Sequence, residues 1–191
     1  MLLPDDQAFE RACSALPFWR RAKLTPLRFD ASRRRSVAVW VLLSEMLREE
    51  GVDLVELSIR ENAFGKPEIV SPVGLFVGLS HAEERVMAVV AHSPVGCDVE
   101  RIRDFKPEIG AEALSPDELA EVTAMADERL RAKFFCRCWV RKESYAKAIG
   151  RGLADGPKTI STLELLRDRA VEFADFDFGN GYLGCVCRLL R

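Results

Sequence analysis

The 191-residue sequence contains no apolar run long enough to cross a membrane. The longest run near the start of a helix-like segment extends from Val37 to Leu43 and ends at Ser44 and Glu45, whereas a membrane span needs about 20 apolar residues. The N-terminal region also lacks the basic, apolar and small-residue parts of an export signal. We therefore expect a cytoplasmic protein with no membrane-spanning segment.

An excess of basic residues is also missing. The 28 lysines and arginines are balanced by 30 aspartates and glutamates, which leaves a net charge of −2. Proteins that bind the phosphate backbone of nucleic acids usually carry a basic excess, so we expect no nucleic acid as a partner. Hydrophobic residues make up 48% of the chain and charged residues 30%, which excludes the fibrous and disordered classes.

Several catalytic signatures are absent: the Walker loop, the dinucleotide-binding glycine motif, HExxH and the nucleophile elbow. The six cysteines do not have zinc-ribbon spacing, because they form two C-x-C pairs and two isolated residues. The pairs are Cys136/Cys138 and Cys185/Cys187, and the isolated residues are Cys13 and Cys97. We expect buried structural thiols; metal binding through sulfur is the less favoured alternative.

Three segments have helical patterns. Apolar residues recur at helical spacing from Ser32 to Glu50, and Gly51 ends this pattern. The segment Ser115-Pro116-Asp117-Glu118 predicts a capping box at the start of a shorter helix. A longer helix is expected from Asp127 to Ile149, followed by Gly150 as a left-handed cap.

Short strand-like runs lie between and after these helices. They cover residues 54–59, 74–79, 85–91, 95–102, 171–176 and 182–189. Asn180-Gly181 is a strong hairpin signal between the last two runs. This order predicts an α+β protein with mostly antiparallel sheets, and we place its midpoint at the Ser93-Pro94 turn.

Asp98 and Glu100 form the first candidate site, in the strand-like segment Gly96-Cys97-Asp98-Val99-Glu100. Because side chains alternate along a strand, both carboxylates project from the same face. Neighbouring carboxylates repel each other unless a cation lies between them, and oxygen ligands favour a hard ion such as Mg²⁺ or Mn²⁺. An exposed strand face with arginine counter-ions is the alternative, and both interpretations stay open on the pattern alone.

The second candidate site is a stripe on the long helix. Trp139, Glu143 and Lys147 recur every four residues, so they share one helix face. A solvated Glu–Lys pair would contribute only about 0.3–0.5 kcal/mol. However, Trp139 and Phe135 at the head of the stripe indicate that it is buried, and buried charges are costly without a partner.

Two shorter patterns could bind phosphate. The strand-like run from Phe76 ends in Ser80-His81, and small polar groups at a strand end suit an anion. The turn Phe64-Gly65-Lys66-Pro67 holds a cation in a fixed place. A solvent-facing histidine and an ordinary surface turn are the alternatives.

Read in order, four motifs resemble the 4′-phosphopantetheinyl transferases, and specifically the larger, Sfp-like type. The motifs are FGKP at 64–67, LSH at 79–81, GCDVE at 96–100 and WVRKESYAKAIGRGL at 139–153. The resemblance covers roughly residues 34–153, and each motif alone is weak.

The resemblance implies a pseudo-dimer of two similar α/β halves, residues 1–93 and 94–191, with the active site in the cleft between them. It also implies a monomeric enzyme that transfers 4′-phosphopantetheine from coenzyme A to a serine of an acyl or peptidyl carrier protein. Mg²⁺ is the implied cofactor, with Mn²⁺ as a substitute, and 3′,5′-ADP is the implied leaving product.

The resemblance also implies roles for individual residues. Asp98, Glu100 and Glu143 would bind the metal. Glu143, Lys147 and Asp98 would be the catalytic residues. Cofactor binding is implied for Arg34, Lys66, Ser80, His81 and Lys147. Lys147 would contact the pyrophosphate, and His81 and one arginine of the triple Arg33-Arg34-Arg35 would face the 3′-phosphate. Arg20, Arg21 and Lys23 remain open as further phosphate ligands, and Gly78 stands where the family usually has asparagine.

Two other functions compete with this hypothesis. A non-catalytic homologue could keep the fold and bind coenzyme A or a carrier protein without turnover. A Mg²⁺-dependent nuclease is the less favoured alternative, because Arg101 and Arg103 follow Glu100 where such sites use lysine, and because the net charge is −2.

Overall fold

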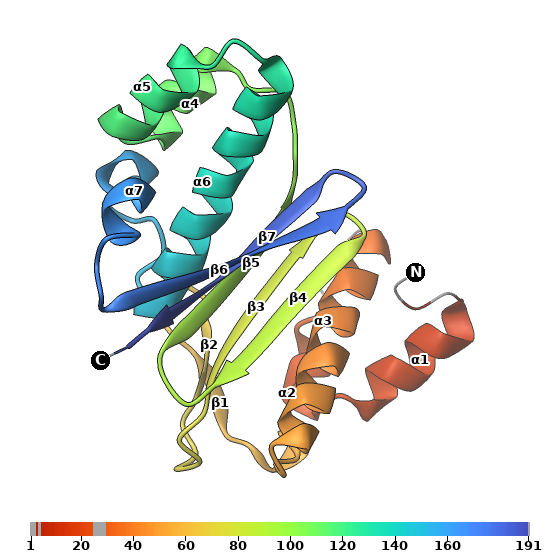
Figure 1. The fold of residues 1–191 in the computed structure, drawn as a ribbon. Coiled ribbons are helices and arrows are strands. Elements are labelled where there is room, and N and C mark those ends of the chain that lie inside the picture. The colour runs from red at the N-terminus through yellow and green to blue at the C-terminus, as the bar shows by residue number, and fades with distance from the viewer. Residues whose placement is uncertain (1–2, 4, 25–29, 191) are drawn as a thin grey trace.

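The computed structural model describes residue 3, residues 5–24 and residues 30–190 (Figure 1). The helices are α1 (Asp6–Ala15), α2 (Phe18–Ala22), α3 (Asp30–Glu49), α4 (Pro107–Ala113), α5 (Pro116–Ala124), α6 (Glu128–Ile149) and α7 (Thr162–Leu165). The strands are β1 (Ile59–Glu61), β2 (Pro67–Ile69), β3 (Phe76–Ala82), β4 (Arg85–Ala91), β5 (Val95–Arg101), β6 (Val171–Gly179) and β7 (Tyr182–Leu189). Two short 3₁₀ helices cover Leu54–Glu56 and Pro157–Thr159.

All strand pairs are antiparallel, which confirms the prediction of a mixed α/β protein with antiparallel sheets. β1 pairs with β2, β3 pairs with β4, and the third sheet has the order β5-β7-β6. Figure 1 shows β3 beside β5, so the β3–β4 hairpin lies next to the third sheet. A Cβ atom on Gly78 of β3 would lie 3.1 Å from the backbone nitrogen of Cys97 in β5, which shows how closely these strands approach.

The two long helices cover different parts of this arrangement. α3 packs on β3 and β4, and its buried residues Val37, Trp40, Leu43 and Leu47 recur at helical spacing. α6 packs against β5 and β7 instead. Each helix therefore buries one apolar stripe against a different pair of strands.

Local signals set the helix boundaries as expected. The Asp127 side chain accepts hydrogen bonds from the amides of Arg129 and Leu130 at the start of α6, and Gly150 ends the helix at φ 73°. Such a left-handed backbone has little steric cost for glycine. The Ser115/Glu118 capping box at the start of α5 is present as well.

The prediction of a strand at residues 54–59 is wrong for most of these residues. Leu54–Glu56 forms a 3₁₀ turn, because the Asp53 carboxylate accepts a hydrogen bond from the Val55 amide and caps it. Only Ile59 of the expected run belongs to a strand. Local side-chain capping therefore overrides the apolar character of this segment.

The prediction of buried thiols is confirmed for five of the six cysteines and is wrong for Cys13, which is partly exposed. All six cysteines are free thiols, and five of them are buried. Burial raises the pKa of Cys97 to about 12, so this thiol stays protonated and unreactive at neutral pH. Among the described helices, none combines the length and the apolar character that a membrane span requires.

Candidate active site

A cavity of about 480 Å³ opens where α3, β3, β5 and α6 meet, and its lining comes from both sides of the Ser93-Pro94 turn. Strand β5 contributes Asp98 and Glu100, and helix α6 contributes Trp139, Glu143 and Lys147. Lys66, Ser80 and His81 line it too. The structure therefore brings together all but one of the predicted site residues.

Close packing of β5 on α6 determines where the acidic residues lie. At Gly96 a Cβ atom would clash with the carbonyl oxygen of Ser144 and lie 2.5 Å from the backbone nitrogen of Ala148. Glycine therefore lets the strand backbone touch the helix backbone. Asp98 and Glu100 follow at alternate positions and reach the cavity beside Glu143 and Lys147.

We expect Gly96→Ala to destabilise the protein by about 2–3 kcal/mol, because the added methyl group must push β5 away from α6. Urea denaturation measures this change. The control is Gly156→Ala, whose Cβ would meet no atom within 4 Å although φ is 85°; it should cost only about 1–2 kcal/mol of backbone strain. Equal losses in the two variants would contradict the close-packing explanation.

Asp98 is the most constrained of the three acids. Its side chain is buried, and Oδ1 accepts hydrogen bonds from Lys147 Nζ at 2.7 Å and from Ser80 Oγ at 2.7 Å. Its other oxygen, Oδ2, is buried without a hydrogen-bond partner among the described residues. A buried carboxylate oxygen without a partner is costly, so this atom is suited to bind a group from outside the chain.

The charges in the cavity influence one another. Burial raises the pKa of Glu100, and the negative charges of Asp98 and Glu143 raise it further. Burial and Asp98 also raise the pKa of Glu143, although Lys147 opposes this effect. Burial alone would lower the pKa of Lys147, but its ion pair with Asp98 outweighs this and the pKa lies above its usual value. The acids therefore repel one another across the cavity.

This repulsion has a consequence for stability. A carboxyl group whose pKa is raised by folding makes the protein less stable as pH rises through the window between its unfolded and folded pKa values. In EDTA, we therefore expect Glu143→Gln to gain stability relative to the parent protein as pH rises from 4 to 7.5, because glutamine carries no charge. Urea denaturation across this range tests the shift. A stability difference that does not change with pH would contradict a pKa of Glu143 that burial and Asp98 raise.

The three carboxylates fit a divalent cation in their chemistry, although no cluster of three His, Cys, Asp or Glu side chains among the described residues is already spaced to hold one. Asp98 offers the unpartnered oxygen, and Glu100 and Glu143 add two carboxyl groups whose pKa values are raised mainly by burial and further by the negative charge of Asp98. Oxygen ligands of this kind suit Mg²⁺ or Mn²⁺. In the described structure, Lys147 supplies the positive charge at Asp98.

The lining of the cavity also includes the basic residues Lys66, His81 and Arg20. Lys66 Nζ donates a hydrogen bond to the Val95 carbonyl at 3.0 Å, and burial lowers its pKa. Partial withdrawal from water lowers the pKa of His81, and the positive charges of Arg35, Lys147 and Arg20 add to this effect. An anion would relieve the repulsion among these groups.

The structure places Arg34 away from the other predicted residues. Its guanidinium binds the Asp30 carboxylate at 2.6 Å and also the Asp6 carboxylate, and it is not among the described residues that line the cavity. Arg20, which the sequence left open, lines the cavity instead and hydrogen-bonds Ser36. Its guanidinium lies 4.9 Å from the centre of the Trp40 ring, and its Nε is buried without a partner among the described residues.

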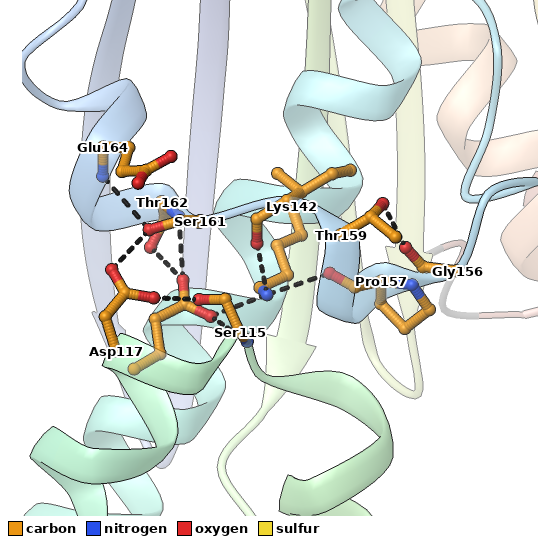
Figure 2. A network of polar contacts seen from close by, with 11 residues as sticks. Ser115, Asp117, Lys142, Gly156, Pro157, Thr159, Ser161, Thr162 and Glu164 are labelled. Carbon is orange, nitrogen blue, oxygen red and sulfur yellow. Dashed lines mark hydrogen bonds and ion pairs between the residues drawn. The ribbon is translucent and has the colours of Figure 1, made fainter.

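A buried polar network lies behind the cavity, on another face of α6 (Figure 2). Lys142 Nζ lies 2.6 Å from Glu118 Oε2, and both side chains are fully buried. The ammonium also donates hydrogen bonds to the carbonyls of Pro157 and Ile160. Glu118 Oε1 accepts hydrogen bonds from the amide and the hydroxyl of Thr162. The carboxylate that caps α5 therefore also connects α5, α6 and α7.

A smaller groove of about 200 Å³ adjoins the acidic end of the cavity and shares Glu100 and Trp139 with it. Ile109 and Phe135 give this groove apolar walls, and Arg103 lies at its edge. Ile109 is 49% exposed. The groove is therefore an open, largely apolar path that leads to the carboxylates.

Comparisons with known proteins agree with the motifs. Residues 94–186 match the family model described as the 4′-phosphopantetheinyl transferase superfamily. A 4′-phosphopantetheinyl transferase of Bacillus pumilus is 29% identical over 140 residues, which are 73% of this chain and 60% of the relative. One from Aneurinibacillus migulanus is 33% identical over 49% of this chain and 38% of its own length.

The transferase Sfp of Bacillus subtilis is 25% identical over 76% of this chain and 65% of its own length. The chain therefore matches less than two thirds of the length of each of these relatives.

Proposed function

Because the chain belongs to the 4′-phosphopantetheinyl transferase superfamily, we propose that it transfers 4′-phosphopantetheine from coenzyme A to a serine of an acyl or peptidyl carrier protein. The observation that carries this proposal is one cavity whose lining combines the carboxylates of Asp98, Glu100 and Glu143 with Lys147 and with further basic residues. Such a cavity complements a diphosphate that carries a phosphorylated nucleoside on one side.

In the proposed reaction, the serine oxygen attacks the phosphorus that bears the pantetheine arm. A bond forms between this oxygen and phosphorus, the phosphoanhydride bond breaks, and 3′,5′-ADP leaves with the bridging oxygen. We assign to Glu143 the role of accepting the serine proton, since a general base must lie beside the acceptor. Lys147 neutralises negative charge on the phosphates, which lowers the barrier to phosphoryl transfer.

We assign the divalent ion, Mg²⁺ or Mn²⁺, to Asp98, Glu100 and Glu143. When bound there, it would neutralise charge on the pyrophosphate and on the leaving group. The unpartnered Oδ2 atom of Asp98 and the repulsion that both glutamates experience from the Asp98 carboxylate support this assignment.

At the nucleotide end, we assign the phosphates to Lys66, His81 and Arg20. Arg20 takes the place given to Arg34 on sequence grounds, because Arg20 lines the cavity and Arg34 is engaged by Asp6 and Asp30. Guanidinium groups bind phosphate well through paired N–H donors. The unpartnered Nε of Arg20 supports this role.

The proposal also covers the arrangement of the chain and its acceptor. We assign residues 1–93 and 94–191 to two halves of a monomeric pseudo-dimer, with the active site in the cleft between them. The carrier serine would approach through the groove beside Ile109, Phe135 and Trp139, since this groove reaches Glu100 from outside. Both halves contribute to the lining of the cavity, which supports this arrangement.

Incubation with coenzyme A, Mg²⁺ and a panel of purified apo carrier proteins tests the function. We expect at least one carrier to gain the mass of one phosphopantetheine in intact-protein mass spectrometry, with release of an equal amount of 3′,5′-ADP. Apo carriers whose acceptor serine is replaced by alanine provide the control. If coenzyme A binds but every carrier keeps its mass, the protein is a non-catalytic binder and the proposal fails.

A further inference from the structure

The Ser80 hydroxyl lies at the centre of the acidic end of the cavity, and its hydrogen bonds can be assigned. Its Oγ atom is 2.7 Å from Asp98 Oδ1, 3.4 Å from Lys147 Nζ and 3.4 Å from the Val99 amide nitrogen. An ammonium group and a backbone amide only donate hydrogen bonds. The single hydroxyl proton of Ser80 therefore goes to Asp98.

This bond fixes the orientation of the Asp98 carboxylate. Ser80 is on β3 and Asp98 on the neighbouring β5, so two packed strands hold the donor and the acceptor in place. With Oδ1 engaged, Oδ2 is the oxygen left without a partner. Lys147 also donates to Oδ1, but a lysine ammonium on a flexible stem is a weaker orienting group than a short hydroxyl side chain on a strand.

The proposed function would draw Lys147 toward the phosphates. If Lys147 turns to an incoming diphosphate, Ser80 becomes the side chain that still holds Asp98 Oδ1. Hydrogen bonds of this kind to a metal-binding carboxylate commonly change metal affinity by about 10–100-fold.

We propose, on the basis of the proposed function, that Ser80 is a positioning residue that orients Asp98 toward the divalent ion. This role differs from the nucleotide-binding role that the sequence motif implied, because the only proton of Ser80 is already committed to Asp98. Lys66, His81 and Arg20 then bind the nucleotide phosphates without a contribution from the Ser80 hydroxyl.

Two binding measurements on Ser80→Ala and Ser80→Thr test this role. The first is the Kd of Mn²⁺ in the presence of saturating coenzyme A, followed by electron paramagnetic resonance of free Mn²⁺. The second is the Kd of 3′,5′-ADP in EDTA, followed by calorimetry. Asp98→Asn is the reference for lost Mn²⁺ affinity, and Lys66→Ala is the reference for lost nucleotide affinity.

We expect Ser80→Ala to weaken Mn²⁺ binding about 10-fold and to leave the affinity for 3′,5′-ADP nearly unchanged. Ser80→Thr should restore most of the Mn²⁺ affinity, because it keeps the hydroxyl on a residue type that strands tolerate. If Ser80→Ala does not fold, Ser80→Cys replaces it, since a thiol is nearly the same size but a weak donor. Melting temperatures identify variants with a general folding defect.

Weaker 3′,5′-ADP binding with unchanged Mn²⁺ binding would overturn the positioning role, and so would unchanged affinity for both ligands. These results do not depend on turnover. If no carrier is modified but Ser80→Ala still weakens Mn²⁺ binding, the proposed function fails and the positioning role stands. If carriers are modified but Ser80→Ala leaves Mn²⁺ binding unchanged, only the positioning role fails.

Discussion

Asp98→Ala and Glu143→Gln should each lower the turnover of carrier modification by at least about 100-fold, as expected for the loss of a metal ligand or a general base. Both side chains line the cavity, and Asp98 holds the unpartnered buried oxygen. Initial rates of holo-carrier formation, followed by mass spectrometry at saturating coenzyme A, measure the effect.

The control for these variants is Glu121→Gln, which removes an exposed carboxylate from α5 outside the cavity. It should keep nearly the full rate. Turnover close to that of the parent protein in both Asp98→Ala and Glu143→Gln would show that these acids are not at the reacting centre.

Glu118→Ala should destabilise the protein by about 3–5 kcal/mol, because it leaves the buried ammonium of Lys142 without its counter-charge. The loss of a capping interaction alone would cost only about 0.5–2 kcal/mol. The larger value follows from the ion pair at 2.6 Å between two fully buried side chains. Urea denaturation at neutral pH measures the change in the free energy of unfolding.

Two controls separate the buried ion pair from an ordinary surface pair. Glu112→Ala removes the partner of Lys158 in an exposed pair at 3.3 Å and should cost less than about 1 kcal/mol. The double variant Glu118→Gln/Lys142→Met removes both buried charges and should recover part of the lost stability. If Glu118→Ala lowers the free energy of unfolding by no more than the loss of a helix cap does, the buried ion pair does not contribute as we expect.

The sequence predicted those parts of the fold that depend on neighbours in the chain. The limits of α6 follow from the Asp127 cap and from Gly150, and the β6–β7 hairpin follows from Asn180-Gly181, which both have positive φ. The prediction of a strand at 54–59 is wrong for a local reason as well, because the Asp53 side chain caps a 3₁₀ turn and this outweighs the apolar run.

Sequence motifs and the periodicity of strands and helices predicted only part of the site. Alternation along β5 placed Asp98 and Glu100 on one strand face, and helical spacing placed Glu143 and Lys147 on one stripe of α6. Only the resemblance implied that the two pairs meet, and the structure has all four around one cavity. The resemblance implied Arg34 and left Arg20 open; Arg20 lines the cavity, whereas Arg34 pairs with Asp6, which is 28 positions away in the chain. No pattern within a helix reveals such a contact.

The position of Lys142 in the sequence already indicates that its side chain is buried. It lies four residues from Cys138 and four from Ala146, both of which are buried. A lysine in the middle of a small, apolar helix stripe indicates a buried partner. The identity of that partner, Glu118, depends on how α5 packs against α6, which the local sequence does not encode.

Anomalous X-ray scattering from crystals grown with coenzyme A and Mn²⁺ tests the central claim most directly. We expect one strong manganese peak in the cavity. It should lie within coordination distance of Asp98, Glu100 and Glu143 and of the pyrophosphate oxygens. A peak that contacts none of these carboxylates, or a pyrophosphate bound outside this cavity, would contradict the central claim.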